Sequence, residues 1–114
     1  MGFFWKTRSD EIIEDIQEIV GNINRDLLQA EHSLVHNRGC NADNIEELGT
    51  ICSNLQQKQT YLESLMSQIS STKLSNVNVP WVDGRYFPIV LWMGSYNMSI
   101  ARIKKWMTDY ARNF

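Results

Sequence analysis

The chain has 114 residues, of which 43% are hydrophobic and 21% are charged, and its net charge is -2. This composition is typical of a folded chain with its own core, and it argues against a disordered protein. We therefore expect one helical domain over residues 1–114. Charge is unevenly spread: residues 9–36 contain seven acidic residues and one basic residue, whereas residues 88–114 contain four basic residues and one acidic residue.

Neither the first residues of the chain nor its longest apolar run suggests secretion or a membrane span. Residues 1–5 are too few for the apolar region of a signal peptide, and the run over residues 86–93 is too short to cross a bilayer. Cys40 and Cys52 are too far apart along the predicted helices for a disulfide. We expect a cytoplasmic protein with reduced thiols and no integral membrane association.

The first predicted helix covers about residues 9–37. Ser9 is a suitable N-cap, and the acidic residues Asp10 and Glu11 follow it in the first turn, where they oppose the helix dipole. Gly39 suits the end of the helix because glycine tolerates left-handed conformations. Apolar residues recur at helical spacing between these ends: Ile12, Ile16, Ile19, Ile23, Leu27, Ala30 and Leu34.

The second predicted helix covers about residues 42–72, and a connector follows over residues 73–87. The helix has an apolar seam with one polar member, Gln59: Ile45, Leu48, Cys52, Leu55, Gln59, Leu62, Met66 and Ile69. The connector contains Pro80 and the turn pair Asp83-Gly84 between apolar residues. We expect an ordered apolar connector across the end of the helices, rather than a layer of strands.

The third predicted helix covers about residues 88–113 and carries a strict heptad stripe: Ile89, Met93, Tyr96, Ile100, Ile103, Met107, Tyr110 and Phe114. All three stripes have a period near 3.5, which favours shallow, coiled-coil-like packing. The predicted fold is all-α, an antiparallel three-helix bundle with long helices and the connector before the third. Long stripes also suit helices that associate between chains, so a homo-oligomer is an open alternative.

Neither a metal site nor catalytic machinery emerges from the sequence. His32, His36 and Cys40 have a spacing that zinc could use, but no fourth ligand is evident. The sequence lacks a nucleophile elbow, a phosphate-binding glycine loop and a dinucleotide fingerprint. We predict a protein that is not an enzyme, with no metal and no cofactor.

The candidate partner-binding residues are aromatic and basic. Trp92 and Trp106 form a second row beside the heptad stripe, accompanied by Arg102 and followed by the basic Lys105. Such a row either packs on both neighbouring helices or forms an exposed surface with the composition of an interface. The terminal aromatics Phe3, Phe4 and Trp5 either fold back, exchange between subunits, bind another protein or contact a membrane.

These features favour a small interaction protein of the inhibitor, immunity, chaperone or adaptor type, which binds a protein partner or itself. One alternative is a small-ligand binder with a pocket formed by Trp92, Tyr96, Trp106, Ser99, Arg102 and Gln59. Another is a peripheral membrane protein anchored by the terminal aromatics. Nucleic acid is a disfavoured partner because the third predicted helix has only four basic residues and the rest of the chain is acidic overall. These four residues are Arg102, Lys104, Lys105 and Arg112.

Overall fold

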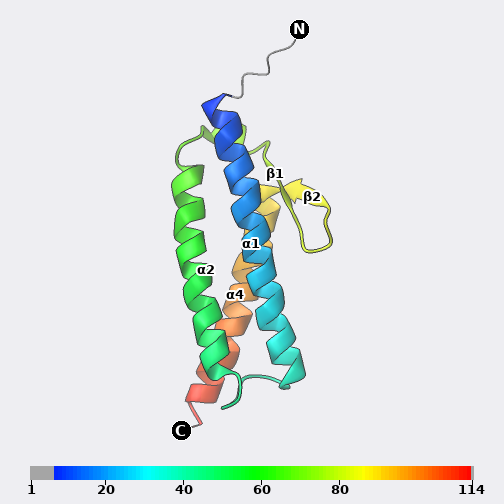
Figure 1. The fold of residues 1–114 in the computed structure, drawn as a ribbon, viewed down its shortest axis with the longest axis vertical. Coiled ribbons are helices and arrows are strands. Elements are labelled where there is room, and N and C mark those ends of the chain that lie inside the picture. The colour runs from blue at the N-terminus through cyan, green and yellow to red at the C-terminus, as the bar shows by residue number, and fades with distance from the viewer. Residues whose placement is uncertain (1–6, 114) are drawn as a thin grey trace.

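The computed structural model describes residues 7–113, and within them the chain is mostly helical. The helices are α1 (Arg8–His36), α2 (Ile45–Met66), α3 (Ser71–Leu74) and α4 (Ile89–Ala111). The strands are β1 (Asn78–Pro80) and β2 (Tyr86–Pro88). The three long helices run along the long axis of the molecule, and α2 returns alongside α1 before α4 runs in the direction of α1 (Figure 1). The mainly helical class predicted from the sequence is confirmed.

Two details of the predicted architecture are wrong. Helix α2 ends at Met66 instead of near residue 72, and the short α3 begins afresh where the Ser70 hydroxyl accepts a hydrogen bond from the backbone N–H of Lys73. The connector also contains an antiparallel strand pair, in which Val79 lies opposite Phe87. Val77 and Val79 are buried while Asn78 between them is exposed. This alternation is that of a short strand with one buried face, so the fold is not purely all-α.

The N-cap of helix α1 lies two residues earlier than the predicted one, Ser9. The cap is Thr7, whose hydroxyl accepts a hydrogen bond from the backbone N–H of Asp10, while the Asp10 carboxylate accepts one from the Thr7 backbone. This reciprocal pair satisfies two amide groups that the first turn leaves without helical partners. At the other end, Arg38 and Gly39 both have positive φ, and the Gly39 N–H donates to the Leu34 carbonyl.

The core lies between the three long helices and the hairpin. Its buried apolar residues come from every element except α3 and β2: Ile12, Ile16, Val20, Ile23, Leu27, Ala30, Leu34, Leu48, Ile51, Leu55, Leu62, Leu65, Val77, Val79, Ile89, Trp92, Tyr96 and Ile103. Within the predicted stripe of α4, Ile89, Tyr96 and Ile103 are buried, and Met93, Ile100 and Met107 pack against them half-buried.

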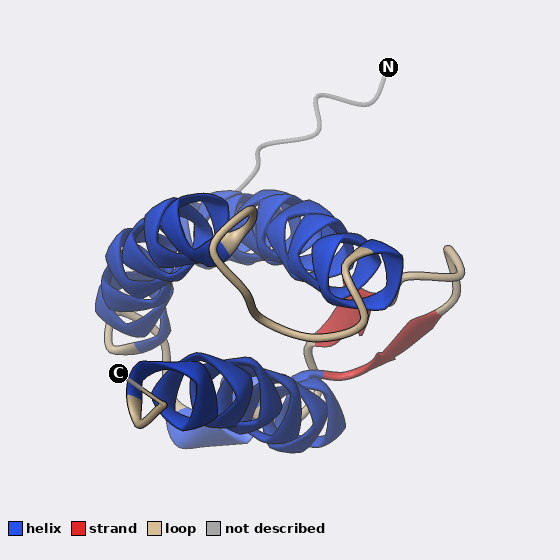
Figure 2. Ribbon diagram, turned by 90° about the horizontal axis from the view of Figure 1, so that it is seen from below, coloured by secondary structure: helices blue, strands red, loops and turns tan. Residues whose placement is uncertain are grey.

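The packing around α4 is looser than that between the first two helices. Helix α1 packs mainly on α2, whereas the contacts of α4 are divided among α1, α2 and the strands. Viewed along the long axis, α4 lies opposite the layer of α1 and α2, with the strand pair at one side (Figure 2). The start of α1 and the end of α4 lie at opposite ends of the molecule, as the sequence predicts (Figure 1). Helix α4 therefore packs less closely on both α1 and α2 than these two helices pack on each other.

Candidate functional site

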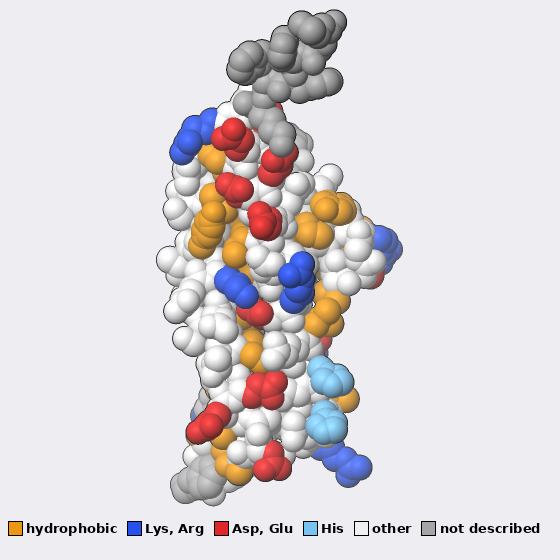
Figure 3. Space-filling view, viewed as in Figure 1, with side chains coloured by type: hydrophobic (Ala, Val, Ile, Leu, Met, Phe, Trp, Pro, Cys, Tyr) orange, Lys and Arg blue, Asp and Glu red, His pale blue; other side chains and the backbone are white. Residues whose placement is uncertain are grey.

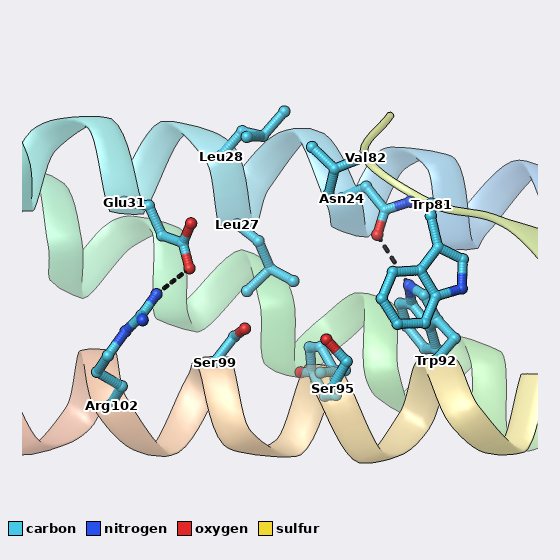
Figure 4. Close-up of a pocket in the computed structure, with 11 residues that line it drawn as sticks. Asn24, Leu27, Leu28, Glu31, Trp81, Val82, Trp92, Ser95, Ser99 and Arg102 are labelled. Carbon is cyan, nitrogen blue, oxygen red and sulfur yellow. Dashed lines mark hydrogen bonds and ion pairs between the residues drawn. The ribbon is translucent and has the colours of Figure 1, made fainter. Parts of the chain in front are cut away.

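A cleft of about 310 Å³ lies between α1, α4 and the loop after β1 (Figure 4). Leucine and valine side chains form part of its upper edge, and serine side chains of α4 point toward α1 from below. The lining residues are Asn24, Leu27, Leu28, Glu31, Trp81, Val82, Trp92, Ser95, Tyr96, Ser99 and Arg102. Four of the six residues predicted from the sequence to form a ligand pocket, Trp92, Tyr96, Ser99 and Arg102, are therefore brought together here.

The floor of the cleft at its hairpin end is held by a buried hydrogen-bond network. The indole N–H of Trp92 donates to Oδ1 of Asn24 at 2.8 Å, and Nδ2 of Asn24 donates to the Pro80 carbonyl at 2.7 Å. Trp92 is only 3% exposed, so it does not belong to the exposed row that was one reading of the sequence. One amide thus ties α1, the end of β1 and α4 together, and no pattern in the sequence pointed to this role.

Tyr96 connects this floor to α2. Its ring stacks on that of Trp92 with centroids 5.3 Å apart, and its hydroxyl donates to Oε1 of Gln59 at 3.0 Å. Burial raises the pKa of the Tyr96 hydroxyl above its ordinary value, so the group remains a donor to a higher pH than an exposed tyrosine does. Gln59 therefore supports the floor from the side of α2 and does not line the cleft, unlike in the predicted pocket.

An ion pair between Glu31 of α1 and Arg102 of α4 crosses the cleft, and their side chains point toward one another (Figure 4). Both side chains are substantially exposed, so the pair contributes little to stability. Beyond it lies a second cavity of about 360 Å³, lined by both members of the pair and by Leu34, Val35, Arg38, Gly39 and Trp106. The ion pair thus separates two cavities within one groove, which we call the α1–α4 groove.

Trp106 sits at the far end of the groove, where its ring packs on the backbone of Gly39. A Cβ atom at position 39 would lie 3.0 Å from Cζ3 of Trp106, closer than an unstrained contact allows. Gly39 is needed there for two reasons, since its φ of +119° also disfavours other residues. Trp106 remains 46% exposed and so lies in the predicted surface row. Lys105 and Asp109 flank it around a shallow hollow of about 230 Å³.

Several of the exposed large apolar residues lie along this groove. Of the nine within residues 7–113, the only one on α2 is Tyr61. The other eight lie on α4, on the hairpin or on the α1 rim of the groove: Leu28, Val35, Val82, Tyr86, Val90, Leu91, Met98 and Trp106. Leu28, Val35, Val82 and Trp106 line the groove, and Leu91 and Met98 lie on the face of α4 beside Arg102. We call these six residues the apolar flank. Only Trp106 among them was singled out from the sequence, because the exposure of the others depends on which neighbours cover them.

The other predicted chemistry is not assembled into a site. The rings of His32 and His36 are stacked 6.3 Å apart, and the two histidines lie next to each other on the surface (Figure 3). Among the described residues, no group of three or more His, Cys, Asp or Glu side chains could hold a metal ion. Cys40 and Cys52 are free thiols, and burial raises the pKa of both.

The membrane and terminal predictions are constrained only in part. Within residues 7–113, none of the helices combines the length and the apolar character needed to cross a bilayer. Phe3, Phe4 and Trp5, the predicted terminal contact residues, lie outside the described residues. Comparisons with protein-family models, curated proteins and solved structures gave no match to this chain, so its function is inferred from its own surface.

Proposed function

We propose that this chain is a non-enzymatic interaction protein that binds a protein partner through the apolar flank. The observation that supports this proposal is the placement of six of the nine exposed large apolar side chains along the groove or on the adjoining face of α4. Contiguous exposed apolar surface is uncommon on monomeric proteins and is typical of interaction sites. Tryptophan, methionine and arginine, which are enriched in interfaces, all occur along this side of α4.

The arrangement of the helices supports the same proposal. We interpret α1, α2 and α4 as an antiparallel bundle that is well packed between α1 and α2 and open between α1 and α4. The two cavities of the groove both lie between α1 and α4. A partner that fills the open side would bury apolar area at roughly 25 cal/mol per Å², before the entropic cost of association is subtracted.

A protein partner explains the flank better than a small ligand does. A molecule that filled the 310 Å³ cleft would contact Trp92, Tyr96 and Ser99. It would leave Leu91 and Met98 in water, because these side chains lie outside both cavities. A second copy of the chain is the alternative protein partner. Membrane contact through the terminal aromatics and the cytoplasmic location stay predictions from the sequence.

The test compares substitutions on the two sides of the molecule. Met98→Lys and Trp106→Lys place a charge on the flank, and Tyr61→Lys is a matched control because Tyr61 is 45% exposed and lies on α2. Each tagged variant is used for affinity capture from the native host, after circular dichroism has shown that its helix content is unchanged. We expect the flank variants to lose the partner captured by the unaltered protein and the control to keep it.

Light scattering of the same variants separates the two kinds of partner. A dimer of the unaltered protein that Met98→Lys dissociates would identify a second copy of the chain as the partner. Capture that is equally strong in all variants, or that is lost only in Tyr61→Lys, would contradict the proposal. The partner's identity would then decide among the inhibitor, immunity, chaperone and adaptor roles.

A further inference from the structure

The two cavities of the α1–α4 groove are repeats of one another, displaced by one heptad. On α1 the first cavity is lined by Asn24, Leu27, Leu28 and Glu31, and the second by Glu31, Leu34, Val35 and Arg38. Each residue of the second set follows its counterpart by seven positions. On α4 the same displacement relates Ser95 to Arg102 and Ser99 to Trp106.

This repeat fixes the spacing that an occupant must match. Seven residues of α-helix rise about 10.5 Å, so the cavities follow each other along the groove at about that interval. A second helix laid along the groove presents its own i and i+7 side chains at the same interval and on the same face, which is the basis of knobs-into-holes packing. An extended strand presents same-face side chains about 6.6 or 13 Å apart, and neither spacing matches.

The charges around the second cavity indicate which charged residues such a helix should carry beside its apolar side chains. Arg38 and Arg102 line this cavity, and Lys105 lies beside it next to Trp106. Within residues 7–113, neither Arg38 nor Lys105 forms an ion pair with an acidic side chain. The exposed Glu31–Arg102 pair can exchange partners at little cost. Acidic residues beside the second apolar side chain would therefore find two unpaired cations.

We infer that the groove receives an amphipathic helix of a partner protein, with large apolar residues at i and i+7 and acidic residues beside the second of them. This inference rests on the proposed function and specifies its partner. A second copy fits less well. Its exposed α4 residues Leu91 and Met98 have the right spacing, but the next residue of that row is Lys105, which would meet the cations of the groove.

The test uses synthetic helical peptides of about 21 residues, long enough for three heptads. Two peptides carry phenylalanines at i and i+7, flanked by glutamates in one and by lysines in the other. Two further peptides of identical composition carry the second phenylalanine at i+9, which a period of 3.6 residues places on the opposite face. Fluorescence anisotropy of the labelled peptides gives the dissociation constants, and amide chemical shifts of the isotope-labelled protein map the site.

We expect the acidic i+7 peptide to bind at least about tenfold more tightly than each of the other three. The largest shifts should fall within residues 24–38 and 95–109, and high salt should reduce the preference for glutamate. The double substitution Arg38→Gln with Lys105→Gln should abolish that preference, whereas Lys73→Gln, an exposed control on α3, should retain it.

Equal binding of the four peptides, tighter binding of a lysine peptide or shifts centred on α2 would overturn the inference. A dimer of the protein that Met98→Lys dissociates but the acidic i+7 peptide does not would also overturn the inference. These failures are distinct from failure of the proposed function. If capture depends on Met98 while the peptides are not discriminated, the flank remains the interface and only its helical occupant is rejected.

Discussion

Replacing Asn24 with alanine tests whether the floor of the groove depends on one buried amide. The side chain is 6% exposed and makes two short hydrogen bonds, one to the Trp92 indole and one to the Pro80 carbonyl. Asn24→Ala leaves the indole N–H without its acceptor in the interior, and it leaves the carbonyl without its donor near the surface. A buried polar group that loses its partner costs about 1–3 kcal/mol.

The expected loss of stability follows from the burial of the two groups that lose their hydrogen-bond partners. The Trp92 N–H is enclosed and incurs most of that cost, whereas the bond to Pro80 is only partly buried, so water can replace part of it. We therefore expect the free energy of unfolding to fall by about 2–4 kcal/mol. Alanine has a higher helix propensity than asparagine, which offsets up to about 0.7 kcal/mol.

Urea unfolding followed by far-ultraviolet circular dichroism measures this loss, with Asn54→Ala as the control. Asn54 is exposed on α2, so its replacement should leave the stability unchanged or slightly raised. Trp92→Phe removes the donor, so the double variant with Asn24→Ala should cost less than the sum of the single losses by about 1 kcal/mol. A loss below about 0.5 kcal/mol for Asn24→Ala, or strict additivity, would refute the role given to this amide.

Four further predictions concern the backbone and the thiols. Gly39→Ala should lower stability by about 1–3 kcal/mol, because Gly39 has a positive φ and contacts Trp106. Adding Trp106→Ala should relieve only the steric part of this loss. An unchanged thermal midpoint of Gly39→Ala would contradict this prediction. Gly94→Ala should raise stability by up to about 1 kcal/mol, since a Cβ at this helical position meets no atom within 4 Å, and a lower midpoint would count against it. Cys52 should react with a disulfide reagent more slowly than Cys40. Because burial raises both thiol pKa values, the native state retains protons that the unfolded chain releases, and stability should decline above the ordinary thiol pKa of 9.0. Equal reaction rates of the two thiols would contradict the first of these predictions, and a stability that does not change at alkaline pH would contradict the second.

The sequence was sufficient for the long helices because their apolar period persists over many turns. The stripe from Ile12 to Leu34 is buried as its spacing predicts, with only Ile19 left half-exposed. The hairpin was missed because each strand has three residues, too few for an alternation of Val77 and Val79 to stand out from a loop. The early end of α2 depends on a local serine cap, which competes with continuation of the helix over that turn.

The two tryptophans of α4 show why the candidate site could be predicted only in part. Trp92 and Trp106 are fourteen residues apart and lie on nearly the same face of the helix, so their periodicity cannot distinguish them. What distinguishes them is tertiary coverage. Asn24 of α1 and the end of β1 enclose Trp92, whereas Trp106 packs on Gly39 beyond the hairpin and remains 46% exposed. Helical periodicity identifies a face, and the chain that returns over it decides how much of that face is exposed.

This unequal coverage gives the two ends of the groove different mechanical properties. At the hairpin end, two hydrogen bonds join three elements through Asn24, and moving Trp92 would break the buried one. At the far end, an exposed ion pair and the contact of Trp106 with Gly39 can rearrange in water at little cost. A partner helix would therefore meet a fixed hairpin end that sets its register. The far end, where Trp106 and the unpaired cations lie, would adjust to the docked helix, so specificity for its acidic residues would arise there.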